Sequence, residues 1–155
     1  MNHVKIKVMD RRTFLIGAGV SAATLAGLST IASATPEEAA AFIAKITGGK
    51  KPTEGGMKLE MPEIAENGAT VPVKVSADTP QTDKDYCKSI TIIATKNPYP
   101  RLCAFHFTPR SGKAFASIRV RMATTQEVMA VAEMSDGSFR IARTTVKVTI
   151  GGCGG

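Results

Sequence analysis

The stretch EVMAVAEMSDGSFRIARTTVKVTI, residues 127–150, decides the fold class of this chain. Runs rich in Val, Ile, Thr and other apolar residues lie on both sides of the turn sequence SDG at 135–137. Short runs of this composition, bounded by turn residues, are typical of β-strands. The stretch therefore predicts strands over 127–134, 138–142 and 144–150.

The same pattern continues toward the N-terminus. Met57, Leu59 and Met61 alternate with polar residues, and so do the three valines of 71–75. Further strand-like runs are SITIIAT (89–95), LCAFHFT (102–108) and AFASIRVRMA (114–123), separated by the turn signals PEIAENG (62–68), NPYP (97–100) and PRSG (109–112). Seven or eight short strands in about 100 residues predict an all-β fold, an antiparallel β-sandwich of the broad immunoglobulin-like kind.

One short helix is predicted before the strands. Thr35 supplies a capping hydroxyl, Pro36 suits the first helical position, and Gly48-Gly49 supplies the stop. An apolar stripe at helical spacing consists of Ala39, Phe42, Ile43 and Ile46. This stripe either covers the protein's own core or docks on a partner. The following GGKKPTEGG, residues 48–56, predicts a solvated loop.

The N-terminal segment has the layout of an export signal. Arg11 and Arg12 precede an uncharged stretch that ends on the small residues of 32–34. A positive region, a modest apolar region and a small-residue site predict a cleaved signal over 1–34, cut between Ala34 and Thr35, rather than a membrane-spanning helix. The adjacent arginines in DRRTFLIG resemble the twin-arginine signal, which predicts export of the folded protein to the periplasm.

Cleavage would leave a mildly basic chain. The signal holds 34 of the 155 residues, four of the 20 basic residues and one of the 13 acidic ones, so the formal net charge falls from +7 to about +4 over the remaining 121 residues. Arg119 and Arg121 alternate along one predicted strand, near Arg110 and Lys113. For an exported protein this basic patch fits an acidic protein surface or an anionic substrate better than nucleic acid.

Three cysteines follow the signal, and an odd number cannot pair completely within one molecule. A hairpin about NPYP would place Cys103 near Ala94 and Cys87 near Arg110. A disulfide between Cys87 and Cys103 and two separate buried thiols both stay open. Cys153 is the thiol left over in an oxidising compartment, where an unpaired cysteine suggests an intermolecular bond or a reactive sulfur.

Cys153 lies in GGCGG, residues 151–155. Gly151, Gly152, Gly154 and Gly155 predict a narrow, flexible arm because glycine carries no Cβ and adopts positive φ readily. Five extended residues reach at most roughly 17 Å, enough to enter another protein's active-site channel. The arm suits a carried sulfur better than a catalyst. His106 is the single histidine after the signal and is predicted to be structural and partly buried, and no metal site is expected.

Four segments carry a family resemblance: MPEIAENGATVPVKV (61–75), ATKNPYPRLCAFHFTPRSGKA (94–114), AVAEMSDGS (130–138) and VKVTIGGCGG (146–155). They resemble the SoxY family, the sulfur-carrier subunits of the bacterial periplasmic thiosulfate-oxidising (Sox) system. The resemblance covers a β-sandwich domain over 35–150 and the arm over 151–155. It implies that Cys153 is the covalent sulfur attachment site, that no cofactor is bound and that the chain is not itself an enzyme.

The resemblance also implies partners. A SoxZ-type subunit would form a heterodimer with the chain. A haem enzyme would couple thiosulfate to the thiol, a hydrolase would release sulfate, and a sulfur dehydrogenase could oxidise the remaining sulfur; no membrane or nucleic-acid partner is implied. Two rival interpretations are a Gly-Gly thiocarboxylate carrier and an adhesive sandwich whose cysteine forms an intermolecular disulfide.

Overall fold

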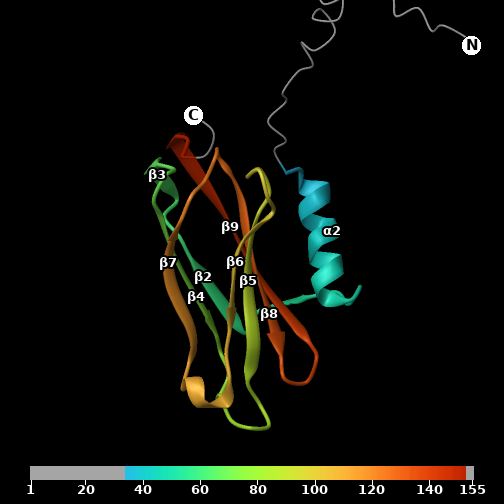
Figure 1. The fold of residues 1–155 in the computed structure, drawn as a ribbon. Coiled ribbons are helices and arrows are strands. Elements are labelled where there is room, and N and C mark those ends of the chain that lie inside the picture. Colours follow the sequence, from blue (N-terminus) through green and yellow to red (C-terminus); the bar gives the residue numbers. More distant parts are fainter. Residues whose placement is uncertain (1–33, 153–155) are drawn as a thin grey trace, which may run out of the picture. The chain divides into compact units, whose positions relative to one another are not determined.

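The computed structural model describes residues 34–152, which form two β-sheets and one α-helix (Figure 1). Strand order in the larger sheet is β1-β9-β8-β5-β6, with β3 also paired to β9; the smaller sheet has the order β2-β4-β7. The elements are α2 (Pro36–Thr47), β1 (Thr53–Glu54), β2 (Met57–Glu60), β3 (Ile64–Asn67), β4 (Val71–Ala77), β5 (Cys87–Ala94), β6 (Arg101–His106), the 3-10 turn η2 (Pro109–Ser111), β7 (Ala114–Val120), β8 (Gln126–Met134) and β9 (Phe139–Ile150).

The predicted helix is confirmed at both ends. The Thr35 hydroxyl accepts a hydrogen bond from the Glu38 N–H at 3.2 Å, and the Glu38 carboxylate accepts one from the Thr35 N–H at 3.0 Å. These two bonds form a capping box, which satisfies donors that the first helical turn leaves unpaired. The helix ends at Gly48, whose φ of 60° and ψ of 31° are left-handed. Glycine adopts this conformation without the steric cost that a Cβ would add.

The apolar stripe of α2 packs on the larger sheet. Ala39 is fully buried against Ile93, Met129, Val131 and Ile141, and the larger side chains of the stripe surround this contact. The helix therefore covers the protein's own sheet, as one of the two predicted alternatives had it.

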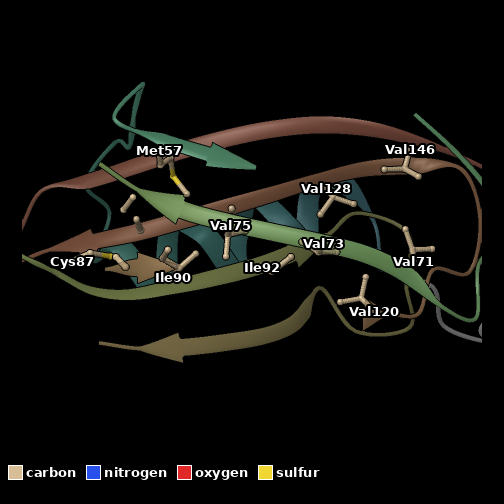
Figure 2. Close-up of a cluster of buried hydrophobic side chains, with 14 of the residues drawn as sticks. Met57, Val71, Val73, Val75, Cys87, Ile90, Ile92, Val120, Val128 and Val146 are labelled. Atoms are coloured by element: carbon tan, nitrogen blue, oxygen red, sulfur yellow. The ribbon is translucent and has the colours of Figure 1, made fainter. Parts of the chain in front are cut away.

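The main core lies between the inner faces of the two sheets (Figure 2). The alternating valines of β4 point into it from the smaller sheet, and Ile90, Ile92 and Val128 point into it from the larger one. Burying side chains of this size contributes about 1.5–3 kcal/mol each relative to leaving them exposed. Cys87 lies at one end of this core, and Val120 and Val146 lie at the other.

Three predictions about strands were incomplete. The runs 138–142 and 144–150 form one strand, β9, which pairs with β8 from Gln126↔Val146 to Glu133↔Phe139. Residues 62–68 contain β3 and the loop 48–56 contains β1; both pair with β9 in parallel. Their sequences are short and rich in turn residues, and their partner lies more than 80 residues away, so local pattern could not reveal the pairing. The larger sheet is therefore mixed rather than purely antiparallel.

The predicted fold of two sheets and one short helix is confirmed at that level. The finer immunoglobulin-like assignment stays a prediction. Within residues 34–152, no helix is long and apolar enough to cross a membrane. The predicted twin-arginine pair, Arg11 and Arg12, and most of the export signal lie outside the described residues, as do Cys153, Gly154 and Gly155.

Candidate functional site

The sequence directs attention to residues 151–155, and the structure describes the point from which this segment departs. Three backbone segments meet there. The Gly68 N–H donates to the Ile150 carbonyl at 2.7 Å, the Met122 N–H donates to the Gly68 carbonyl at 2.7 Å, and the Gly152 N–H donates to the Met122 carbonyl at 2.9 Å. We call this meeting point of residues 67–69, 122–123 and 150–152 the glycine junction.

The glycine junction has no room for side chains at its three glycines. A Cβ on Gly68 would lie 2.8 Å from the Gly152 nitrogen and 2.9 Å from Cγ1 of Val148, and closer still to the Met122 carbonyl oxygen. A Cβ on Gly151 would collide with the Ala123 carbonyl, and a Cβ on Gly152 would collide with the backbone of 68–69. Glycine is required here because of close backbone approach.

This packing gives Gly151 and Gly152 a reason to be glycine that the sequence did not suggest. The prediction concerned the flexibility of Gly151, Gly152, Gly154 and Gly155. In the structure the first two lie against neighbouring backbone, and Gly152 donates a hydrogen bond to it. Their flexibility stays a prediction. Cys153, the predicted attachment site, follows directly after the hydrogen-bonded Gly152.

A buried polar network holds the middle segment of the glycine junction. Asn97 is 4% exposed. Its Nδ2 donates to the Arg121 carbonyl at 2.7 Å, and its Oδ1 accepts from the Ala123 N–H at 3.0 Å and from Nε2 of Gln126 at 2.7 Å. Buried polar groups satisfied in this way hold a loop in one conformation. The position of residues 121–123 is therefore fixed by the side chain of the NPYP turn.

The same turn contacts the predicted cleavage site. Ala34 is 4% exposed, and its N–H donates to the Asn97 carbonyl at 2.7 Å. The bond between Ala34 and Thr35 therefore adjoins the helix cap and lies against the folded domain. Cleavage between these residues stays a prediction.

The other two cysteines are free thiols. Cys103 pairs with Ile92 rather than with Ala94, so the predicted register was wrong by two residues, and Cys87 pairs with Met134 of β8. Ile92, the residue opposite Cys103, lies five positions along β5 from Cys87. Five residues of a strand span about 16 Å. A disulfide needs Cα atoms within about 7 Å. The alternative of two separate thiols is the one that the structure has.

Both thiols are poorly suited to chemistry in the folded protein. Burial raises the pKa of Cys87 to about 11 and the pKa of Cys103 to about 11. Because the thiolate is the nucleophile, only about one such group in 10,000 would be reactive at pH 7. Neither thiol competes strongly with an ordinary cysteine for an electrophile.

The sequence pattern did not predict a groove that is lined by three arginines. A groove of about 490 Å³ lies between the start of β6 and the end of β7, which are edge strands of different sheets. Arg101, Arg119 and Arg121 line it together with Leu102, Cys103 and Ile118, and no acidic residue is among the described residues that line it. Arg119 and Arg121 were predicted to share a basic patch with Arg110 and Lys113. Lys113 instead lines another groove with residues 76–79, and Arg101 was not foreseen.

The remaining candidate residues offer little chemistry. His106 is exposed on the edge strand β6, so the prediction that it is partly buried was wrong. Among residues 34–152, no group of three or more His, Cys, Asp or Glu side chains could hold a metal ion. The glycine junction and the adjacent arginine-lined groove are therefore the features that surround the departure point of residues 151–155.

Comparisons with known proteins identify the family of the chain. A family model described as sulfur oxidation protein SoxY matches residues 43–153. The solved structure of the sulfur carrier protein SoxY from Chlorobium limicola f thiosulfatophilum is 34% identical, with a TM-score of 0.61, and the match covers 75% of this chain and 100% of that one. A comparison with curated proteins found no match.

More distant structures share the fold alone. Superoxide reductase (neelaredoxin) from Ignicoccus hospitalis is 17% identical with a TM-score of 0.54, and the match covers 74% of this chain and 94% of that one. Superoxide reductase from Nanoarchaeum equitans is 7% identical with a TM-score of 0.53, and the match covers 63% and 100% of the two chains. The extent of the family match and the identity to the Chlorobium protein settle the relationship. The chain belongs to the SoxY family of sulfur oxidation proteins.

Proposed function

We propose that this chain is a sulfur carrier of the thiosulfate-oxidising Sox system and that Cys153 holds the sulfur covalently. The observation that carries the proposal is that the family match ends at Cys153, which follows directly after the glycine junction. The related Chlorobium protein is described as a sulfur carrier. Burial raises the pKa values of the two other thiols that follow the signal, Cys87 and Cys103, and this supports Cys153 as the thiol that reacts.

The proposed cycle uses the thiol as a handle. Oxidative coupling of the Cys153 thiol with thiosulfate gives Cys–S–S–SO3⁻ and releases one proton and two electrons, which the haem of the coupling enzyme accepts. A hydrolase then adds water across the terminal S–S bond, giving Cys–S–SH, sulfate and one proton. A sulfur dehydrogenase could oxidise the remaining sulfane sulfur. The carrier supplies the thiol and its presentation, and its partners supply the catalysis.

The cellular setting belongs to the same proposal. We expect export by the twin-arginine route through Arg11 and Arg12, cleavage after Ala34, a periplasmic location and a heterodimer with a SoxZ-type subunit. The immunoglobulin-like class of the sandwich is likewise expected from the family resemblance. The burial of the helix stripe on the chain's own sheet argues against that stripe as the subunit interface.

Intact mass spectrometry of the protein from thiosulfate-grown cells tests the proposal. We expect increments of sulfur and thiosulfate that disappear with a thiol reductant, map to the peptide that contains Cys153 and are absent from a Cys153→Ser variant. Cys103→Ser is the matched control, because its thiol is partly buried and should carry nothing. An unmodified mass would contradict the proposal. A Cys153-linked homodimer would favour the adhesive interpretation, and sulfur loading of Cys153→Ser would favour a thiocarboxylate.

A further inference from the structure

An asparagine followed by a glycine, Asn67-Gly68, lies in the glycine junction. In such a dipeptide the backbone nitrogen of the glycine can attack the side-chain amide carbon of the asparagine, because no Cβ on the glycine hinders the approach. Residues 34–152 contain one other asparagine, Asn97, and the proline that follows it has no backbone N–H. Among the described residues, this reaction is therefore open to Asn67.

The side chain of Asn67 is well placed to be attacked. It is exposed at the end of β3, and its Oδ1 accepts a hydrogen bond from the Ala69 N–H at 2.8 Å. A donor at this distance polarises the amide carbonyl and stabilises the negative charge that develops on the oxygen when a nucleophile adds to Cγ. Because the side chain is exposed, water can reach the product and hydrolyse it.

The attacking nitrogen is held away by the fold. The Gly68 N–H donates to the Ile150 carbonyl at 2.7 Å, and the Gly68 carbonyl accepts from the Met122 N–H at 2.7 Å. Attack requires that this nitrogen lose its proton and turn toward Cγ of Asn67, which the pairing of Asn67 with Ile150 opposes. Gly68 is also buried against neighbouring backbone, so its peptide group has no room to turn while the junction is closed.

The hydrogen bond to Ile150 lies where the fold opens readily. Ile150 is the last residue of β9, its side chain is 67% exposed, and β3 is its partner strand (Figure 1). Positions with few buried contacts open locally at a lower free energy than the centre of a sheet. Residues 151–155 follow directly, so a partner that draws this segment away also pulls on the Ile150 carbonyl.

We propose that Asn67 is a deamidation site that the closed glycine junction protects and the open junction exposes. The Gly68 nitrogen bonds to Cγ of Asn67, and its proton passes through water to the side-chain nitrogen, Nδ2. The bond from Cγ to Nδ2 then breaks and releases ammonia, which leaves a cyclic succinimide. Water hydrolyses either of the two C–N bonds to this nitrogen and gives aspartate or isoaspartate, and no oxidant or reductant takes part.

Deamidation changes the junction irreversibly. Isoaspartate carries the main chain through Cγ, and the added carbon atom displaces Gly68 from its close contacts with Met122 and Gly152. Both products also place a carboxylate beside the departure point of residues 151–155. This carboxylate would repel an anionic adduct on Cys153, a consequence that rests on the proposed function. The reaction at Asn67 does not depend on that function.

Peptide mapping of the purified full-length protein, with any subunit that co-purifies, tests the proposal. During incubation in mildly alkaline buffer, mass spectrometry follows the replacement of NH2 by OH in the peptide that contains Asn67, and protein isoaspartyl methyltransferase detects isoaspartate. A synthetic peptide of residues 61–75 has no junction and gives the unprotected rate. We expect the folded protein to react about 10- to 100-fold more slowly than the peptide, because two hydrogen bonds that each contribute up to about tenfold must open.

Three variants connect the rate to the junction. Asn97→Leu removes the side chain that holds residues 121–123, so Asn67 should react about tenfold faster than in wild type. Tyr99→Ser is the matched control in the same turn; its side chain is exposed, and the rate should equal that of wild type. Asn67→Ser should show no mass change in this peptide.

Amide hydrogen exchange of Gly68 in the wild-type protein gives a second measurement that needs no variant. Its protection factor should equal the ratio of the peptide rate to the protein rate, because both report the same opening. Reaction of the folded protein at the peptide rate would overturn the inference. So would a rate far below the one that exchange allows, or equal acceleration by Asn97→Leu and Tyr99→Ser.

The outcome is separate from that of the proposed function. Sulfur loading is read on the peptide that contains Cys153, whereas deamidation is read on the peptide that contains Asn67. A chain that loads sulfur but deamidates at the peptide rate keeps its function and loses this inference. A chain that never loads sulfur but shows the protected rate and its acceleration by Asn97→Leu has the reverse result.

Discussion

Two glycine pairs in this protein look alike in sequence and act differently in the structure. Gly48 and Gly49, after α2, have φ values of 60° and 80°, and a Cβ on either would meet nothing within 4 Å. Gly151 and Gly152, after β9, are absent from the positions with positive φ, and a Cβ on either would collide with neighbouring backbone. The first pair is glycine for its conformation, and the second is glycine for its lack of volume.

The difference bears on how residues 151–155, the candidate carrier segment, leave the domain. A conformational glycine lets the chain turn wherever it lies, whereas a close-packed glycine fixes where the chain passes. The glycine junction therefore sets the place from which Cys153 departs, beside Met122 and the groove. Any swinging motion would begin after this point, provided that the junction stays closed.

The largest expected effect comes from removing the support of the junction. Asn97→Leu would leave the Ala123 N–H, the Arg121 carbonyl and the Gln126 amide without their partner. We expect the free energy of unfolding to fall by about 3 kcal/mol, since each buried polar group left unpaired costs about 1–3 kcal/mol. Urea denaturation measures this. Tyr99→Ser, in the same turn but 79% exposed, should change it little. Equal effects of the two variants would show that the network does not support the junction.

Gly68→Ala should have the next largest effect. Its Cβ would press on the Met122 carbonyl, on Val148 and on Gly152, and overpacking of this kind costs about 1–3 kcal/mol. Because the obstacle is volume, Gly68→Asn should be worse than Gly68→Ala. Thermal unfolding of the two variants would decide the order. An asparagine variant as stable as wild type would mean that the backbone segments separate easily, and the comparison of the two glycine pairs would fail.

Gly48→Ala should cost less and follow the opposite rule. A Cβ in the left-handed conformation costs about 1 kcal/mol, and space is open around it. Asparagine tolerates this conformation better than alanine, so Gly48→Asn should recover part of the loss. The order of alanine and asparagine at position 48 should thus be the reverse of the order at position 68. The same order at both positions would contradict the assignment of one glycine to conformation and the other to volume.

The sequence predicted the parts of the fold that depend on local pattern. The capping hydroxyl of Thr35, the glycine stop at Gly48 and the valine alternation of β4 all act within a few residues, and all three predictions were confirmed. It missed β1 and β3 because each is short and is held by a partner distant in sequence. The predicted β5–β6 register was wrong because the turn is not centred on NPYP: Ile93 already pairs with Arg101, and the Ala94 N–H donates to the Pro100 carbonyl.

The site was predicted in composition but not in arrangement. GGCGG drew attention to Cys153, and the alternation of Arg119 and Arg121 suggested a basic surface. The groove needs Arg101 as well, and Arg101 lies on the edge strand of another sheet, so its proximity follows from how the two sheets face each other. The clash at Gly68 is similarly invisible, because it depends on three segments separated by more than 25 residues each.

Gly152→Ala should have the smallest effect on global stability and the most specific one on the departing segment. Gly152 lies beyond the last strand, so the chain can avoid the clash with residues 68–69 by breaking one hydrogen bond, from its own N–H to the Met122 carbonyl. Such a bond contributes about 0.5–1.5 kcal/mol. We expect the midpoint of urea unfolding to change little and the exchange protection of the residue 152 amide to be lost, while the amides of Gly68 and Met122 keep theirs. Amide hydrogen exchange measures all three. Gly154→Ala is the control outside the described residues and should leave the three rates unchanged. If Gly152→Ala instead lowered protection throughout β9, the junction would be part of the cooperative fold, and the candidate carrier segment would be anchored more firmly than one hydrogen bond implies.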